Sequence, residues 1–317
     1  MSFRIEQTGS GPEEIVKLFH PAHGEYAVWY PYFGGLLNEL ALWDGNRIRS
    51  VLDGYPDRPS MEKLSYSRGI KMSPFPNRIR DGAFRFRGQA YQLPINKPNE
   101  HNAIHGFLQK APFQLESVSL EEEAATLVLS HQYLGNYTGF PFPYSYRLEY
   151  RMEATGSLSC TTKVVNEGSE TMPLGDGWHP YFRFDGKADD WWLQLPSTDY
   201  LGTDERLLPT GEIHRLEHFS ARECIGEQLF DTGFRLSQTP GTAKTLLLEP
   251  KSGAALELWQ ETGPGKYNFL QVYIPPSRDS IALEPMTCAA DAFNSGQGLI
   301  ELAPGEGFEA SYGVRLI

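Results

Sequence analysis

The sequence predicts an all-β fold, a large antiparallel β-sandwich with few short helices. Its 317 residues include 31 glycines and 23 prolines, a composition typical of many short strands joined by tight turns. Segments that alternate apolar and polar residues, as half-buried strands do, recur along the whole chain. There is no linker-like segment and no repeat of fixed period. We therefore expect residues 1–317 to form a single domain, a size that all-β folds allow.

The predicted strands follow one another closely. Short helical turns are expected only around residues 57–70 and 219–228. Tight turns fall at His20–Gly24, Gly34–Gly35 and Asp44–Asn46, and residues 83–93 alternate around Gly88 like a hairpin. The segments expected to form the strands are 14–20, 25–33, 37–43, 46–52, 83–93, 120–133, 145–154, 158–168, 244–261 and 269–275.

The charge balance argues against nucleic-acid and membrane partners. Lysine and arginine total 28 against 40 acidic residues, a net charge of −12, and the basic residues form no stripe. No apolar run approaches the length of about 18 residues that a membrane span needs. The N-terminal segment lacks the apolar core of a signal peptide, and the three widely spaced cysteines, Cys160, Cys224 and Cys288, form no CxxC motif. We expect a cytoplasmic protein.

Two polar segments in the first half of the chain are candidates for ligand binding. Asn77 and Arg78 follow two prolines in PFPNRI, and an arginine fork held there suits a hydroxyl-rich or carboxylate partner, although a solvated strand position fits equally. His105 in NAIHG fits a neutral hydrogen-bond donor. His101 lies four residues earlier, but no glutamate follows it as in HExxH, and metal binding is a minor alternative.

Three further residues stand out in the second half. His179 lies in GDGWHPYF, where glycines allow close approach of a ligand and Trp178 offers a flat face for a sugar ring. Glu284 is set in the apolar segment IALEP, where burial would raise its pKa toward the range of a general base. Asp231 in FDTGF fits either a ligand contact or a turn cap. There is no GxSxG, GxxxxGK[ST] or GxGxxG motif, so no cofactor is expected.

Taken in order, these segments resemble the aldose 1-epimerase family, also called galactose mutarotases. The resemblance covers residues from about 30 to the C-terminus, and it implies one large antiparallel β-sandwich with an open sugar groove. The segments that carry it are NRIRDGAFRFRGQAYQL at 77–93, NAIHG at 102–106, HPYF at 179–182, FDTGF at 230–234, QVY at 271–273, LEPMTCAADAFN at 283–294 and APGEGFEASYGVRL at 303–316.

The resemblance also implies roles for individual residues. Glu284 matches the family's general base and His179 its general acid. The residues that match its sugar contacts are Asn77, Arg78, His105, Asp231 and Gln271. Phe107 stands where galactose-type members often have glycine, and Arg183 where they have asparagine. These two departures put galactose itself in question as the substrate.

The expected reaction interconverts the α and β anomers of a free aldohexose by ring opening and closure. The expected partner is therefore a small sugar, and we expect a monomer or a weak homodimer. One alternative is a hexose 6-phosphate mutarotase, whose phosphate would pair with arginines. A second is a non-catalytic sugar-binding protein, in which aromatic side chains such as Trp178 stack on the ring and the carboxylates only form hydrogen bonds. A third is a metal enzyme using His101 and His105. The arginines considered for phosphate are Arg78, Arg80, Arg85, Arg87 and Arg183.

Overall fold

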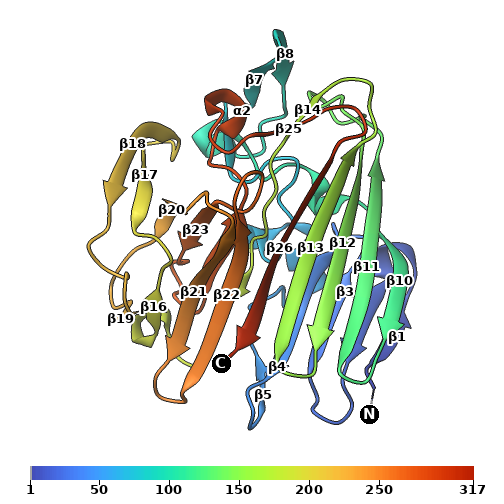
Figure 1. Cartoon of the computed structure of the whole chain (residues 1–317), viewed down its shortest axis with the longest axis vertical. Helices are drawn as coiled ribbons and strands as arrows, with labels where there is room; N and C mark the ends of the chain where they lie inside the picture. The colour runs from blue at the N-terminus through green and yellow to red at the C-terminus, as the bar shows by residue number, and fades with distance from the viewer. Residues whose placement is uncertain (1) are drawn as a thin grey trace.

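The computed structural model describes residues 2–317, and strands make up most of its regular structure. Strand content is 49% against 8% helix, and the sheets are antiparallel. The predicted all-β, antiparallel fold is therefore confirmed. Figure 1 shows the long strands of the largest sheet side by side, with smaller sheets packed against it.

The largest sheet has nine strands in the order β10-β11-β12-β13-β26-β22-β21-β16-β19. Its central strands run nine or ten residues. Their bounds are β10 Gln114–Leu120, β11 Ala124–Tyr133, β12 Tyr144–Glu153, β13 Ser157–Asn166, β16 Trp192–Gln194, β19 Glu223–Cys224, β21 Gly241–Glu249, β22 Ala254–Thr262 and β26 Gly307–Leu316.

Two smaller sheets and three two-stranded ribbons complete the fold. The five-stranded sheet is a meander of β1 Arg4–Thr8, β2 Ile15–Phe19, β3 Tyr26–Tyr30, β4 Leu36–Trp43 and β5 Ile48–Ser50. The six-stranded sheet runs β15 Tyr181–Phe182, β24 Ile281–Met286, β23 Phe269–Tyr273, β20 Asp231–Arg235, β17 Asp199–Thr203 and β18 Pro209–Arg215. The ribbons pair β6 Arg78–Arg80 with β9 Asn102–Ile104, β7 Ala83–Phe86 with β8 Gln89–Gln92, and β14 Met172–Leu174 with β25 Ile300–Leu302.

One face of the nine-stranded sheet carries the core. Tyr150, Cys160 and Tyr312 lie opposite one another on successive strands, so their side chains share this face, and all three are buried. Trp29 of the five-stranded sheet packs on Tyr150 with ring centroids 5.1 Å apart. Trp178, which leads into the six-stranded sheet, stacks on Tyr312 at 5.0 Å. Both smaller sheets therefore cover the same face, and the core lies between the layers.

The helical predictions are half correct. Helix α1, Arg58–Glu62, lies in the predicted 57–70 segment and begins where the Asp57 side chain accepts a hydrogen bond from Ser60 N. Residues 219–228 form no helix, and this prediction is wrong. There the Glu223 carboxylate accepts from Phe219 N, and residues 223–224 pair with β16 as β19. The alternation signal also missed several strands, among them β1, β10, β16 to β19 and β26, and the short helix α2, Ala292–Ser295.

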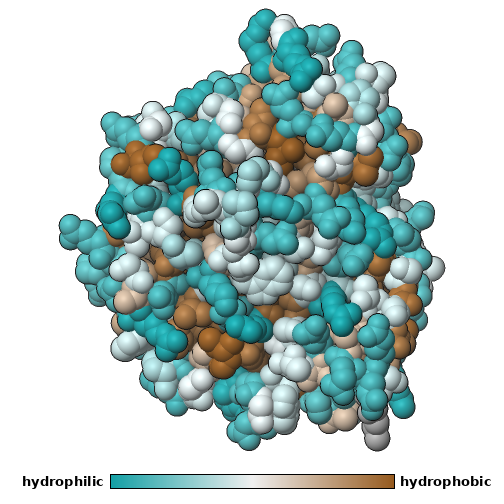
Figure 2. All heavy atoms as spheres, in the orientation of Figure 1, coloured by the Kyte–Doolittle hydropathy of each residue, from teal (hydrophilic) through white to brown (hydrophobic). Residues whose placement is uncertain are grey.

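The face of the molecule in Figure 2 is mainly hydrophilic. Figure 2 shows hydrophilic side chains over most of the face viewed, with hydrophobic ones in separate patches. Within residues 2–317, no helix has the length and apolar character needed to cross a bilayer.

Leu148 tests how much the packing between sheets contributes to stability. It is fully buried in β12 and approaches the β3–β4 turn at Gly35. We expect Leu148→Ala to lower the free energy of unfolding by about 2–5 kcal/mol, because a cavity would remain in the core. Ile213→Ala, at a side chain 45% exposed, should change it by less than about 0.5 kcal/mol. Urea unfolding of both variants measures this, and equal effects would contradict the assignment of the core.

Candidate active site

All seven residues predicted as site residues line one cavity of about 910 Å³. These are Asn77, Arg78, His105, His179, Asp231, Gln271 and Glu284. They come from β6, the end of β9, the segment before β15, and strands β20, β23 and β24. Residues more than 200 positions apart in the sequence therefore meet in one place, which supports treating this cavity as the functional site.

The register of the six-stranded sheet brings His179 and Glu284 together. Tyr181 of β15 lies opposite Ala282 of β24. Because the two strands are antiparallel, the residue two positions before Tyr181, His179, faces the residue two positions after Ala282, Glu284. His179 Nε2 lies 3.3 Å from Glu284 Oε1. On the next strand, Gln271 lies opposite Glu284 and points to the same side of the sheet.

Burial controls the protonation of this pair. It lowers the pKa of His179 to about 3 and raises the pKa of Glu284, which is 2% exposed, well above its ordinary value. Both groups are therefore favoured in their neutral forms, with one proton on the carboxyl and the imidazole free to accept. Glu284 Oε2 and His179 Nδ1 have no hydrogen-bond partner among residues 2–317. A carboxyl group that can donate a proton, in contact with an imidazole that can accept one, can serve as a general acid and a general base.

The β6–β9 ribbon holds Asn77 and His105 against each other. Both adopt the left-handed backbone conformation, with φ of 55° and 61°. His105 N donates to Asn77 O at 2.8 Å, and Asn77 N donates to His105 Nδ1 at 3.2 Å. Because Nδ1 accepts a hydrogen bond and burial lowers the pKa of His105 well below its ordinary value, its proton resides on Nε2. Left-handed backbone at non-glycine residues is costly and concentrates at functional sites.

Gly106 makes this conformation possible. It also has a positive φ, of 66°, and a Cβ there would lie 2.1 Å from Ser73 O. Any other residue would therefore push the His105 turn away from the segment that precedes Asn77. The ring of His105 then lies 5.2 Å from that of His179, edge to face.

A chain of hydrogen bonds orients the polar groups of the cavity. Gln271 Nε2 donates to Asp231 Oδ1 at 2.7 Å, and Asn77 Nδ2 donates to Gln271 Oε1 at 3.3 Å. Arg78 Nη1 donates to Asn77 Oδ1 at 3.0 Å, while Arg78 Nε and Nη2 bind the two oxygens of Glu100 at 2.6 and 3.3 Å. The two amides are thereby fixed in orientation. Desolvation raises the pKa of Asp231, and Arg78 opposes that shift.

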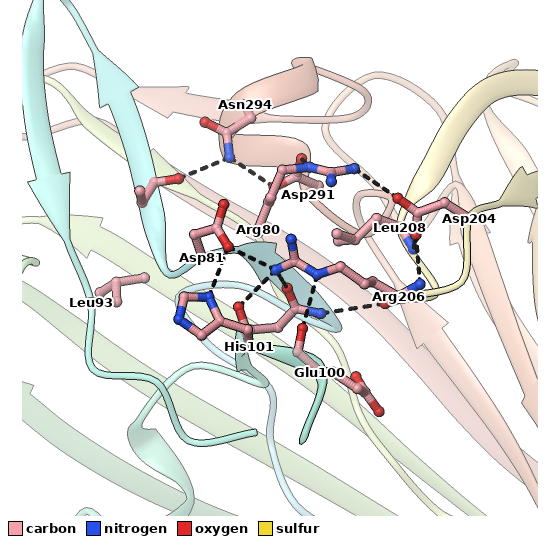
Figure 3. Close-up of polar contacts among 12 residues, drawn as sticks. Arg80, Asp81, Leu93, Glu100, His101, Asp204, Arg206, Leu208, Asp291 and Asn294 are labelled. Atoms are coloured by element: carbon pink, nitrogen blue, oxygen red, sulfur yellow. Dashed lines mark hydrogen bonds and ion pairs between the residues drawn. The ribbon is translucent and has the colours of Figure 1, made fainter. Parts of the chain in front are cut away.

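The segment that carries Glu100 is anchored from outside the cavity (Figure 3). Arg206 donates to the carbonyl oxygens of Glu100 and His101 at 2.9 and 2.8 Å and to the carboxylate of Asp81 at 2.9 Å. His101 also bonds Asp81, through Nδ1 at 2.9 Å. Arg206 therefore fixes the rim and, through Glu100, the position of Arg78.

A buried ion pair lies behind the catalytic candidates. Lys71 Nζ donates to Asp176 Oδ2 at 3.1 Å, to Thr162 Oγ1 at 3.2 Å and to the hydroxyl of Tyr312 at 3.2 Å. These three bonds use all three N–H donors of the Lys71 ammonium group. Tyr267 donates to Asp176 Oδ2 at 2.7 Å, and Tyr146 donates to Asp176 Oδ1. Both charged side chains are at most 1% exposed.

The backbone of Asp176 ties together the segments that carry His179 and Glu284. Asp176 lies three residues before His179, and Thr287 lies three residues after Glu284. Asp176 N donates to Thr287 Oγ1, and Thr287 N donates to Asp176 O, both at 2.9 Å. Neither Lys71 nor Asp176 was predicted as a functional residue, because nothing local to either indicates that they meet.

Three interpretations of the sequence are corrected. Trp178 does not line the cavity; it is 2% exposed and stacked on Tyr312, so it cannot also stack on a sugar in the cavity. His101 is exposed and turned toward Asp81, so it forms no metal cluster with His105. The arginines considered for phosphate, apart from Arg78, lie outside the cavity and bond elsewhere: Arg80 to Asp204, Arg85 to Gly88 O, Arg87 to Glu301 and Arg183 to Asp53.

Several lining residues were missed by the sequence analysis. Tyr181 stacks on His179 with centroids 5.1 Å apart, and its hydroxyl donates to Tyr66 O at 3.0 Å. Tyr273 lies two residues after Gln271 on the same side of β23. Both belong to the HPYF and QVY motifs, and strand alternation would have placed them beside His179 and Gln271. Glu100, by contrast, has no signal in the sequence beyond its segment.

Comparison with known proteins agrees with this geometry. Residues 17–315 match the family described as aldose 1-epimerase. The uncharacterized protein YihR of Escherichia coli is 30% identical over 258 residues, 79% of each chain. Human galactose mutarotase is 28% identical over 171 residues, 51% of this chain and 45% of that protein.

Solved structures show the same fold. A galactose mutarotase-like protein from Clostridium acetobutylicum superposes with a TM-score of 0.84 at 20% identity, over 100% of this chain and 99% of the other. Galactose 1-epimerase from Lactobacillus acidophilus gives 0.81 at 18% identity, over 99% and 98% of the two chains.

The buried ion pair generates a stability prediction. Asp176→Asn keeps the shape but leaves Lys71 charged without a counter-ion, and we expect the free energy of unfolding to fall by about 3–5 kcal/mol. Asp279→Asn, which breaks the exposed pair with Lys187, should cost less than about 1 kcal/mol. Urea unfolding of the two variants compares them. A loss below about 1 kcal/mol for Asp176→Asn would show that the pair does not hold the site together.

Proposed function

Because the chain belongs to the aldose 1-epimerase family, we propose that it interconverts the α and β anomers of a free aldohexose. The observation that carries this proposal is the contact between His179 and Glu284 at 3.3 Å inside a polar cavity. Anomer exchange needs one group to accept a proton while another donates one. This pair offers both, because burial raises the pKa of Glu284 and lowers that of His179, which favours a carboxyl that can donate beside an imidazole nitrogen that can accept.

The proposed reaction begins with a transfer within the pair. The proton moves from Glu284 to His179 when the sugar binds, leaving a carboxylate and an imidazolium. Glu284 then takes the proton of the C1 hydroxyl, His179 delivers one to the ring oxygen O5, and the C1–O5 bond breaks to give the open-chain aldehyde. Rotation about C1–C2 and the reverse transfers close the ring on the other face. The steps transfer protons and break and re-form the C1–O5 bond, with no net change in oxidation state, so the proposed mechanism requires no cofactor.

The remaining polar residues hold the sugar in place. His105 Nε2–H and the Arg78 guanidinium are donors, and Asp231 and Gln271 offer acceptors, so together they suit an array of hydroxyl groups. Their orientation is set before the sugar arrives, by the bonds to Asn77 and Glu100. Such preorganisation lowers the entropic part of the barrier.

A second substrate class has one observation in its favour. Lys63, Lys97 and Lys110 line the cavity and are exposed, so a hexose 6-phosphate would find cations there although the predicted arginines other than Arg78 lie outside it. For the non-catalytic binding alternative, Trp178 is buried and cannot stack on a sugar in the cavity, whereas Tyr181 and Tyr273 line it. We place the activity in the cytoplasm, in keeping with three cysteines that form no disulfide.

Polarimetry of freshly dissolved sugars tests the proposed activity. We expect the chain to accelerate anomer exchange of α-D-glucose or α-D-galactose, and Glu284→Gln to reduce the rate by about 10²–10⁴-fold, because the base is lost. Glu212→Gln, an exposed glutamate outside the cavity, is the matched control and should retain full activity. Near-full activity of Glu284→Gln would refute the assignment. Acceleration with hexose 6-phosphates alone would favour the second substrate class.

The pH dependence of stability gives an independent test of the pair. Burial raises the pKa of Glu284 above its ordinary 4.5, so the native state holds a proton that the unfolded chain releases above that pH. The free energy of unfolding of the wild type therefore falls as the pH rises from about 4.5 through the native pKa. The amide that replaces the carboxyl group in Glu284→Gln does not titrate, so that variant lacks this contribution to the pH dependence.

We expect Glu284→Gln to be as stable as the wild type near pH 5 and increasingly more stable than it toward pH 8. Urea unfolding of both proteins across this range measures the difference. A variant that instead loses stability relative to the wild type as the pH rises would mean that Glu284 is ionised in the native protein.

A further inference from the structure

A second cluster of functional side chains lies far from the cavity, at the β2–β3 turn. His20 and Glu25 close this hairpin, where His20 N donates to Glu25 O and Gly24 N donates to His20 O, both at 2.8 Å. His23 lies in the loop between them. Ligand atoms of the three side chains all lie within 4.8 Å of one another. None of these residues lines the cavity.

Glu25 is the unusual member of the cluster. It is completely buried, and its Oε2 has no hydrogen-bond partner within the described chain. Its other oxygen, Oε1, accepts from Trp43 N at 3.2 Å, which fixes the carboxylate. The nearest basic atom to Oε2 is His23 Nδ1 at 3.9 Å. A buried carboxylate oxygen without a partner is costly, and it is oriented toward two imidazoles.

We propose that His20, His23 and Glu25 form a binding site for a divalent transition-metal ion of the zinc class. Two imidazoles and one carboxylate are a zinc ligand set, and a fourth position remains for water. Tetrahedral coordination at about 2.0–2.1 Å places ligand atoms about 3.4 Å apart. The His23–Glu25 pair at 3.9 Å needs to close by about half an ångström, and the ligand atoms farthest apart, which lie within 4.8 Å of each other, by at most about 1.4 Å.

The surroundings allow this closure. The His23 side chain is 41% exposed, so it can move toward the ion and leaves a side open to solvent. His20 is buried beside Phe3, and its Nδ1 accepts only a long bond of 3.3 Å from His23 N, which a metal ion displaces. The bound ion joins the turn to β4 through Glu25 and Trp43, and therefore stabilises the five-stranded sheet.

Zinc titration of the full chain, first stripped with a chelator, tests the site. Calorimetry should show one Zn²⁺ bound per chain, and His23→Ala should weaken binding by at least about tenfold, since even groups that only support metal ligands contribute 10–100-fold. His218→Ala is the matched control: an exposed histidine 2.9 Å from Glu223, which should leave binding unchanged. Absence of zinc binding, or equal effects of the two variants, would overturn the proposal.

Two further measurements separate this site from nonspecific binding. Zn²⁺ should raise the Tm of the wild type and not that of His23→Ala. Mg²⁺, which prefers oxygen ligands, should have no such effect, and an equal response to Mg²⁺ would contradict a zinc-class site. Because His23 stacks on Trp43 at 5.8 Å, Co²⁺ should quench fluorescence in the wild type and less in Trp43→Phe. Equal quenching in both would place the ion elsewhere.

Discussion

The buried ion pair of Lys71 and Asp176 is the interaction on which the site depends. Two opposite charges in a protein interior are stable only when their remaining polar atoms are also bonded. Here Thr162 and Tyr312 from the large sheet accept hydrogen bonds from the Lys71 ammonium group. Tyr146 and Tyr267 donate hydrogen bonds to the Asp176 carboxylate. The pair therefore joins the core face of the nine-stranded sheet to the segments that carry His179 and Glu284.

The same burial that stabilises the fold also sets the chemistry of the cavity. Desolvation shifts the pKa values of His179 and Glu284 in opposite directions, so the two are favoured as neutral neighbours and hold one proton. This arrangement costs conformational and hydrogen-bonding free energy at a few positions. Asn77 and His105 keep a left-handed backbone, and Glu284 Oε2 has no hydrogen-bond partner within residues 2–317. Departures from the rules of packing at these positions are typical of functional sites.

The rim of the cavity depends on long-range contacts. Arg206, from the loop between β17 and β18, donates hydrogen bonds to the backbone around Glu100 (Figure 3). The Glu100 carboxylate in turn accepts a bidentate pair of hydrogen bonds from Arg78. The cavity wall is therefore assembled from separate loops anchored to rigid strands. The β2–β3 turn differs in this respect, because its three candidate ligands lie within six consecutive residues.

The sequence by itself determined the β class of the fold, many of its strands and the polar residues that gather in the cavity, because alternation and turn residues act over a few positions. It predicted His179 and Glu284 as candidates, but not their contact, which follows from the register of β15 against β24. It placed Trp178 beside a sugar, whereas tertiary packing buries that ring on Tyr312. Only the tertiary structure decided which residues 100 or more positions apart would meet, such as Lys71 with Asp176, since no local pattern encodes a long-range contact.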